Sequence, residues 1–317
     1  MTEASHRKRF LALSLFFVAL LGILVWRMVT LMILDRSFLQ GQGDARSVRV
    51  VNIPAFRGMI FDRFGAAIAV STPVQTVWIN PKKFDPTPEE LNQLARILNL
   101  PAKKITARVH RVETRGFLYL KRHLPPAEAQ KIEALHIPGV NFKQEFKRYY
   151  PEGESAAQLI GFTNIDDDGI EGLELAYQDW LNGVPGKRRV IKDRTGRIID
   201  ELGVIQEPKP GRGLQLSIDK RLQSIAYHEL QKTVTEFGAK SGSVVALDAN
   251  TGEVLAVVNY PSFNPNMRNR YEVSDYRNRA MTDLFEPGSV IKPFGIASAL
   301  ESGLFKPDTI IDTRPSW

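Results

Sequence analysis

The sequence of 317 residues contains no cysteine. This absence excludes disulfide scaffolds, thiolate zinc sites and cysteine nucleophiles. The five histidines show neither the His-x-x-x-His nor the His-Glu-x-x-His spacing of metal sites. Acidic residues are fewer than basic ones, 35 against 42, but no run of five like charges and no nucleic-acid motif accompanies this imbalance. We therefore expect no metal, no cofactor and no nucleic-acid partner.

Long apolar runs are scarce too, and the longest lies near the N-terminus. Phe10–Trp26 carries no charge over 17 positions, and a second apolar run, Met28–Leu34, follows Arg27. This length is at the lower limit for a membrane span, and the arginine can extend it by snorkelling. Basic residues directly precede the run, and no small-x-small cleavage site follows it. The sequence therefore predicts a cytoplasmic tail over 1–9, a retained signal anchor over 10–34 and a periplasmic remainder; a buried helix of a soluble protein is the alternative.

The rest of the chain divides at a segment rich in proline and glycine. This segment, Gly203–Gly213, is expected to separate one domain over 35–213 from the beginning of another over 214–317. Short strand and helix patterns alternate in the first of these, and between about 84 and 150 they indicate a small α+β insertion. The predicted fold class is therefore α+β, with an α/β domain starting in the C-terminal region.

Local signals predict individual elements. Thr87, Pro88 and Glu90 match a helix start with a capping box. The stretches RSVRVVNIPA, AAIAVSTPVQTVWIN and FLYLKRHL indicate strands, the second of them more than one, and PPAEAQKIEAL indicates another helix. Further on we expect a strand in LQLSID, a helix from Lys220 to about Phe237, and two apolar strands, SGSVVALD and EVLAVVNY, around a turn.

Two polar stretches were candidates for binding sites, and both favour structural roles. In NIDDDGIEGLEL, Asn164, Asp166 and Asp168 match the first ligands of a calcium loop, but Leu175 stands where a bidentate glutamate is required. In RGMIFDRFG, Asp62 lies between two arginines and could belong to an anion site. The favoured interpretation is that Asp62 pairs with a neighbouring arginine and holds a strand–turn unit together.

Three serines stand three positions before a lysine: Ser5, Ser217 and Ser289. The first lies in the predicted tail. Ser217 ends a predicted strand and is interpreted as a strand-end or capping residue. Ser289 follows the turn Pro287–Gly288 and begins an apolar helix, so Lys292 would share a helix face with it.

This arrangement could supply the groups of a serine nucleophile. The Ser289 hydroxyl would lie at the positive end of the helix dipole, and its backbone N–H could serve an oxyanion. A lysine base must be neutral, a state that burial of Lys292 among Val290, Ile291 and Phe294 would favour. From the residues alone, catalysis and helix capping are equally good interpretations of Ser289.

A family likeness adds to these observations. The apolar N-terminus is followed in order by GDARSVRV, RGMIFDRFG, FKRYYPEGE, LIGFTNIDDDGIEGLE, KDRTGRIID, LQLSIDKRLQ, LDANTGEVLAVVNYPSFNPN and NRAMTDLFEPGSVIKPF. Over essentially its whole length the chain resembles the class B penicillin-binding proteins, and among them the cell-division (FtsI) type. Penicillin-binding proteins carry Ser-x-x-Lys together with Ser-x-Asn and Lys-Thr-Gly motifs.

The resemblance implies a fold and a reaction. It implies one transmembrane helix, an elongated α+β pedestal (dimerisation) domain, and the start of an α/β transpeptidase domain with a serine β-lactamase-like fold. Ser289 would be the acylated nucleophile and Lys292 its general base, cross-linking peptidoglycan stem peptides that end in D-Ala-D-Ala during septal wall synthesis. β-Lactams would acylate the same serine. The implied location is the inner membrane, and the implied partners are an FtsW-type glycosyltransferase and other division proteins.

One departure from the family pattern is large. No Ser-x-Asn and no Lys-Thr-Gly or Lys-Ser-Gly strand follows Ser289. We therefore expect the chain to be an N-terminal portion that is inactive alone. A catalytically silent, membrane-anchored interaction module that docks division proteins is the alternative function. An elongation-type relative is disfavoured because GDARSVRV and RYYPEGE are typical of the division type.

Overall fold

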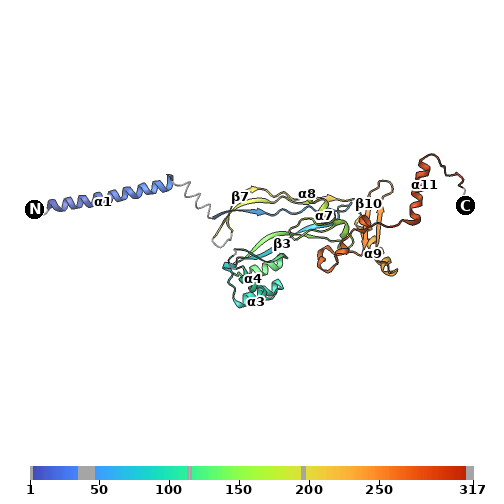
Figure 1. Ribbon diagram of the computed structural model, residues 1–317. Coiled ribbons are helices and arrows are strands. Elements are labelled where there is room, and N and C mark those ends of the chain that lie inside the picture. The colour runs from blue at the N-terminus through green and yellow to red at the C-terminus, as the bar shows by residue number, and fades with distance from the viewer. Residues whose placement is uncertain (1–2, 35–46, 113, 115, 194–197, 312–317) are drawn as a thin grey trace.

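The computed structural model describes residues 3–34, 47–112, 114, 116–193 and 198–311. The molecule is elongated, with helix α1 (Glu3–Val29) at one end and helix α11 (Lys292–Glu301) at the other (Figure 1). We use "pedestal" for the described residues between 47 and 213, and "C-terminal part" for those from 214 to 311.

The N-terminal helix continues into a short π-helix, η1 (Thr30–Leu34). Among the residues described, the segment Leu13–Met32 is the one helix long and apolar enough to cross a membrane. Its 20 residues span about 30 Å at 1.5 Å per residue, which matches the hydrocarbon thickness of a bilayer. No part of the span is buried against the rest of the protein. This agrees with the predicted membrane anchor and not with a core helix of a soluble protein.

A three-stranded antiparallel ribbon forms one side of the pedestal. Its central strand β6 (Gly186–Lys192) pairs with β1 (Val48–Ile53) on one edge and with β7 (Ile198–Gln206) on the other. All of β7 is exposed, so this ribbon contributes little to the hydrophobic core. The segment Gly203–Gly213 is tied to the pedestal at both ends, because its first residues belong to β7 and Lys209 forms a bridge with Val184.

The main sheet of the pedestal is organised around one long strand. Strand β3 (Ala67–Ile79) pairs with β5 (Val140–Tyr149) over ten residues and with β4 (Leu118–Leu124) on its other side. The prediction of more than one strand in this stretch was wrong: Pro73, which suggested a break, lies within the continuous ladder opposite Phe146. The sheet is extended by two short strands, β2 (Ile60–Phe61) and β8 (Leu214–Gln215), which run parallel to each other.

Three helices pack on one end of this sheet, within the stretch where a small α+β insertion is predicted. They are α3 (Pro88–Leu98), α4 (Ala102–Arg111) and α5 (Pro126–Glu133). The predicted capping box of α3 is present, with the Thr87 side chain accepting from Glu90 N and the Glu90 side chain accepting from Thr87 N. The core beneath these helices consists of aliphatic side chains, among them Val77, Ile79, Leu94, Leu98, Ile105, Leu124 and Ile132.

A second core joins the pedestal to the C-terminal part. It packs Ile60, Ile68 and Ile160 from the pedestal against Phe263 from the C-terminal part. The Phe263 side chain is 1% exposed, and its ring makes an edge contact with Phe162 and a tilted contact with Tyr276. The short helices nearby are α6 (Ala157–Ile160), α7 (Gly172–Ala176), α8 (Gln178–Leu181), η3 (Pro265–Arg270) and η4 (Val273–Tyr276). Since apolar contacts cross the boundary, the two parts form one packed body in this region.

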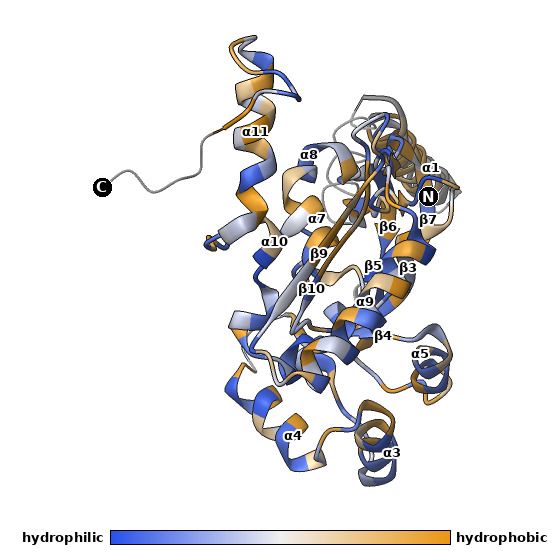
Figure 2. Cartoon of the chain, turned by 90° about the vertical axis from the view of Figure 1, so that its right-hand side faces the viewer, coloured by the Kyte–Doolittle hydropathy of each residue, from blue (hydrophilic) through white to orange (hydrophobic). Residues whose placement is uncertain are grey.

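In the C-terminal part, β8 is followed by helix α9 (Lys220–Glu236), which packs on the antiparallel pair β9 (Gly242–Leu247) and β10 (Val254–Tyr260). All three were predicted. Helix α10 (Arg279–Thr282), the 3-10 helix η5 (Gly288–Ile291) and α11 follow. In both views α11 stands away from the rest of the protein (Figures 1 and 2), and apolar positions are visible along it in Figure 2.

Candidate active site

Ser289 and Lys292 lie at the junction of two helical segments. The first is within η5, and the second is the first residue of α11; Lys292 N donates to Ser289 O. Because side chains three positions apart eclipse each other in a 3-10 turn, the two side chains lie on one side of the chain. Gly288 precedes them with φ +55°, a conformation that glycine adopts without strain. The predicted Ser-x-x-Lys geometry is therefore present locally.

The side chains of Ser289, Lys292 and their apolar neighbours are not buried. Val290 is 71% exposed, Ile291 53% and Phe294 69%, and Ser289 and Lys292 are exposed as well. Among the residues described, nothing packs on this face of α11, so the burial of Lys292 that would favour a neutral base is not present.

Ser217 has a structural role. Its hydroxyl donates to Val254 O at 2.7 Å and so ties the segment before α9 to the start of β10. It is not a helix cap: Asp219 occupies that position, with its Oδ1 accepting from Arg221 N and Leu222 N. The chain ends the short strand β8 at Gln215, so the expectation of a strand-end or capping serine was wrong. Ser5 falls within α1, and its side chain lies outside the described residues.

Asn259 orders the chain that leads to Ser289, and sequence reasoning missed it. It lies on β10 and is 1% exposed. Its Oδ1 accepts from Ser243 Oγ at 2.8 Å and from Ala280 N at 2.7 Å, while its Nδ2 donates to Asn278 Oδ1 at 3.0 Å. The β9–β10 pair thereby fixes the start of α10. A buried amide in the otherwise apolar run VLAVVNY is the signal that could have revealed it.

A buried charge centre holds the pedestal together. Glu174, at 0% exposure, accepts from Arg57 Nε and from Arg148 Nε, both at 2.6 Å. The same Arg57 also donates to Glu174 O at 2.7 Å and to Gln178 Oε1 at 2.8 Å. These residues come from RGMIFDRFG, FKRYYPEGE and GIEGLE, stretches far apart in the sequence. Two guanidinium groups sharing one carboxylate lock them into one unit.

Comparisons with known proteins place these stretches in a family. The Penicillin-binding Protein dimerisation domain matches residues 52–216, and the Penicillin binding protein transpeptidase domain matches residues 242–317. The chain belongs to the penicillin-binding proteins. The probable peptidoglycan D,D-transpeptidase PbpC of Pseudomonas aeruginosa is 44% identical over 100% of this chain and 56% of its own length.

Other relatives of this penicillin-binding protein agree. The peptidoglycan D,D-transpeptidase FtsI of Escherichia coli is 41% identical over 93% of the chain and 51% of its own length. A solved structure titled as the structural coordination of polymerization and crosslinking by a peptidoglycan synthase complex has a TM-score of 0.61 at 26% identity, covering 95% of this chain and 56% of that one. Penicillin Binding Protein 2X of Streptococcus thermophilus shares the fold, with a TM-score of 0.60 at 20% identity over 82% of this chain and 43% of its own. The chain spans about half the length of the curated relatives it matches.

Asp62 of this penicillin-binding protein connects the pedestal to the C-terminal part. Its Oδ1 accepts from Phe64 N at 2.8 Å and from Ala66 N at 2.7 Å, and its Oδ2 accepts from Lys220 N at the start of α9 at 3.4 Å. Asp62 does hold a strand–turn unit, but the predicted arginine partner was wrong. Backbone N–H groups satisfy it, while the neighbouring Arg63 pairs with Glu253.

A second tie between the two parts runs through Glu154 and Gln223. The carboxylate of Glu154 accepts from Tyr227 Oη at 2.8 Å and from Tyr271 Oη at 2.6 Å. Burial raises the pKa of the Tyr227 phenol, and the hydrogen bond to Glu154 raises the pKa of Tyr271. Gln223, 1% exposed, donates to Ser155 O and Val257 O and accepts from Val257 N. Because their pKa values are raised, the phenols of Tyr227 and Tyr271 stay protonated at neutral pH and donate to Glu154.

In the loop that resembles a calcium site, the carboxylates of Asp166 and Asp168 bond to different partners. Asp166 pairs with Arg122 at 2.7 Å, and Asp168 accepts from the Asn164 side chain at 3.2 Å. No group of three or more potential metal ligands occurs in the part of the chain that the structure describes. The loop therefore acts as a turn whose backbone N–H groups bond to Asn164 Oδ1.

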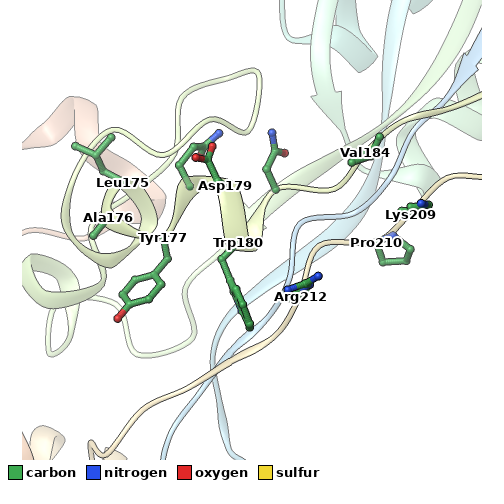
Figure 3. Close-up of a pocket in the computed structure, with 11 residues that line it drawn as sticks. Leu175, Ala176, Tyr177, Asp179, Trp180, Val184, Lys209, Pro210 and Arg212 are labelled. Carbon is green, nitrogen blue, oxygen red and sulfur yellow. The ribbon is translucent and has the colours of Figure 1, made fainter.

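Two further features lie outside the Ser289 region. A hollow of about 570 Å³ in the pedestal is lined by residues of α7, α8 and the segment 209–212, where the Arg212 guanidinium lies 4.8 Å from the Trp180 ring (Figure 3). A Lys-Ser-Gly triplet, Lys240 to Gly242, opens β9 ahead of Ser289 and went unnoticed in the sequence. A Cβ at Gly242 would meet Leu230 Cδ1 at 2.8 Å, so this glycine permits β9 to pack closely on α9.

Proposed function

We propose that this chain is the membrane-anchored N-terminal half of a peptidoglycan D,D-transpeptidase of the cell-division type. The observation that carries the proposal is the 41–44% identity to two peptidoglycan D,D-transpeptidases over nearly the whole chain. The transpeptidase-domain match includes Ser289 and Lys292, and their three-residue spacing across η5 and the start of α11 supports a serine nucleophile with an adjacent base.

In the proposed reaction, Ser289 Oγ attacks the carbonyl of the penultimate D-alanine of a stem peptide. Lys292 accepts the hydroxyl proton, and the backbone N–H of Ser289 contributes to stabilising the oxyanion. The peptide bond breaks, the leaving amine of the terminal D-alanine takes up the proton, and an ester to Ser289 remains. An amine of a neighbouring stem peptide then attacks this ester, which forms the cross-link and regenerates the hydroxyl. β-Lactams would open on the same serine and leave a longer-lived ester.

The proposal includes the surroundings of the enzyme. The tail over 1–9 would be cytoplasmic and the residues after 34 periplasmic, with the division between pedestal and transpeptidase domain near 213. The anchor and pedestal would dock an FtsW-type glycosyltransferase and other division proteins. The exposed edge strand β7 also fits a purely interacting module, which is the second candidate.

A chimera tests the two candidates against each other. The matched half of Escherichia coli FtsI is replaced by this chain, and release of D-alanine from a stem peptide is measured alongside fluorescent-penicillin labelling. We expect the chimera to be labelled and the 317-residue chain alone to remain unlabelled. Lys292→Ala should slow acylation at least ~100-fold, because the serine then lacks a nearby base. A folded chimera that neither releases D-alanine nor takes up penicillin supports the interaction module instead.

A further inference from the structure

A pocket of about 300 Å³ lies where the pedestal meets the C-terminal part. Its walls come from β4, β5, the loop 163–167 and η3. Asn266 of η3 holds the two sides together, since its Oδ1 accepts from Tyr150 N at 3.1 Å and its Nδ2 donates to Tyr150 O at 2.9 Å. The walls are therefore fixed by direct hydrogen bonds and are not a loose surface groove. We call this cavity the Arg148–Asp167 pocket.

Unsatisfied polar atoms are concentrated there. In the described part of the chain, four buried side-chain nitrogen or oxygen atoms lack a hydrogen-bond partner, and three of them belong to residues that line this pocket. These atoms are Arg148 Nη2, Asp167 Oδ1 and His123 Nε2. Arg148 is only 4% exposed. Each orphaned buried donor or acceptor costs about 1–3 kcal/mol, so a group that entered the pocket and bonded to these atoms would be stabilised.

Two of these three residues have strained backbones. His123 has φ +57° and Asp167 has φ +69°; neither is glycine. A register shift in the β3–β4 ladder accompanies His123 and turns its side chain out of the regular alternation. Asp167 is held by Arg57, whose Nη1 donates to Asp167 O at 3.2 Å. Such strain persists where the surroundings over-determine a conformation, and it is common where side chains clamp a ligand.

The charges around the pocket define what it can accept. Lys147, Arg148 and Arg268 line it, with Asp167 as the opposing carboxylate. Arg148 uses Nε for Glu174, which leaves Nη2 free to donate, and the Arg268 guanidinium is braced over the Phe162 ring at 4.1 Å. Burial raises the pKa of Asp167 to about 6, so above that pH its orphaned oxygen is an anionic acceptor. The occupant must offer both an anionic acceptor and a donor.

We propose that the Arg148–Asp167 pocket binds a small ligand that carries a carboxylate beside an N–H donor, as a free amino acid or the C-terminal residue of a peptide does. The carboxylate accepts from Arg148 Nη2 in the field of Lys147 and Arg268, and the N–H donates to Asp167 Oδ1. The cavity is about ten times the 30 Å³ that one water occupies, which is room for such a group. This site is separate from Ser289 and does not depend on acylation.

Ligand-observed NMR on the whole chain in detergent micelles tests this proposal. The probes are carbon-13-labelled glycine, glycylglycine, acetate and methylamine. We expect glycine or glycylglycine to bind saturably with a Kd on the order of 1 mM, the weak range accessible to so few atoms. Acetate and methylamine should bind at least tenfold more weakly, because each offers one half of the required chemistry. Which of the first two binds better distinguishes a free amino acid from a peptide terminus.

Three single-residue variants test whether glycine and acetate bind in the Arg148–Asp167 pocket. Asp167→Asn keeps a residue that tolerates positive φ and should weaken glycine binding about tenfold while leaving acetate binding equal or tighter. Arg268→Gln, on the opposite wall, should weaken both. Arg221→Gln removes an exposed arginine outside the pocket and should change neither. Thermal melts of all variants establish that each is folded.

Three results would overturn the proposal. One is the absence of saturable binding by glycine and glycylglycine, which would mean that water alone fills the pocket. Another is binding that Asp167→Asn and Arg268→Gln leave unchanged. The third is acetate binding as tightly as glycine in the parent protein, which would make the pocket a general anion site. If Asp167→Asn does not fold, the Arg268→Gln result decides.

Discussion

At the scale of single residues, the pedestal depends on buried charges that form ion pairs with one another. Arg57, Arg148 and Glu174 are each at most 4% exposed, and the one carboxylate is bonded to both guanidinium groups. A pair of this kind adds little net stability compared with apolar side chains of the same volume, but removing one partner leaves uncompensated buried charge. The three stretches that supply these residues are therefore mutually dependent.

Glu174→Gln should consequently destabilise the pedestal severely. We expect a loss of about 3–5 kcal/mol, because two buried arginines would remain without a carboxylate. Urea unfolding followed by tryptophan fluorescence measures it. The control is Glu201→Gln, which removes the partner of Arg188 in an exposed pair and should cost less than about 1 kcal/mol. Equal losses in the two variants would contradict the assigned role of Glu174.

Titration of the Asp167 carboxyl should make the stability of the folded protein depend on pH. Burial, the largest cause, raises its folded-state pKa to about 6 from the ordinary value of 3.8. Between these two values the folded state holds more protons than the unfolded state, so this group contributes stability at low pH that is lost as pH rises from about 4 to 6. Melting temperatures of Asp167→Asn and the parent, compared across that range, should show the variant gaining relative to the parent. A constant difference would contradict the raised pKa.

At the scale of elements, local signals predicted helices better than strands. Helix α3 was predicted with its cap because Thr87, Pro88 and Glu90 lie within one turn, so their chemistry can be read from adjacent positions. Strand β3 was divided wrongly because Pro73 suggests a break; the pairing with β5 that carries the strand through it joins residues about 75 apart. Pairing over such distances leaves no local trace in the sequence.

The candidate site shows the same contrast between local signals, which the sequence contains, and long-range contacts, which it does not reveal. Ser289 and Lys292 were found because a three-residue spacing is local. Asn259, the Arg57–Glu174–Arg148 centre and the Arg148–Asp167 pocket were missed because each needs segments that only the fold brings together. The wrong arginine partner of Asp62 has the same origin: its acceptors face backbone N–H groups, one of them 158 positions away.

Close backbone crossings give an element-scale prediction. Gly161 and Gly65 both have positive φ, at 77° and 82°, but a Cβ on the first would lie 1.8 Å from Glu171 O, whereas nothing lies within 4 Å of a Cβ on the second. Gly65→Ala should therefore cost only the left-handed strain of about 1–2 kcal/mol. Gly161→Ala should cost well over that, because the loop before α7 must also move. Thermal melts of the two variants compare them, and similar shifts would contradict the crossing.

At the scale of the whole molecule, the ordered contacts end before α11. The pedestal and α9 share apolar packing, the Asp62 bonds and the Glu154–Tyr227 bond. By contrast, α11 exposes Phe294 and Ile296 at 69% and 61%, and several residues of β9 are exposed as well. Exposed apolar surface of this extent is typical of a face that another segment covers. In the proposed function, acylation of Ser289 would therefore depend on what covers α11.

Membrane topology is a second property of the whole molecule. The apolar span Leu13–Met32 follows basic residues, so residues after the span should lie in the periplasm. Alkaline phosphatase fused after Trp317 should be active, and green fluorescent protein fused there through the Sec pathway should be dark. The opposite pattern would contradict both the orientation and a role in the cell wall.

The most direct test of the central claim is to map the β-lactam adduct in the chimera with the C-terminal half of Escherichia coli FtsI. After labelling and proteolysis, mass spectrometry should find the acyl group on the peptide that contains Ser289. Ser289→Ala should abolish labelling without loss of folding. Ser217→Ala should retain labelling and cost about 0.5–1.5 kcal/mol, because only its hydrogen bond to Val254 O is lost. An acyl group on the Ser217 peptide, or Ser289→Ala labelled at the parent rate, would contradict the assignment of Ser289 as the nucleophile.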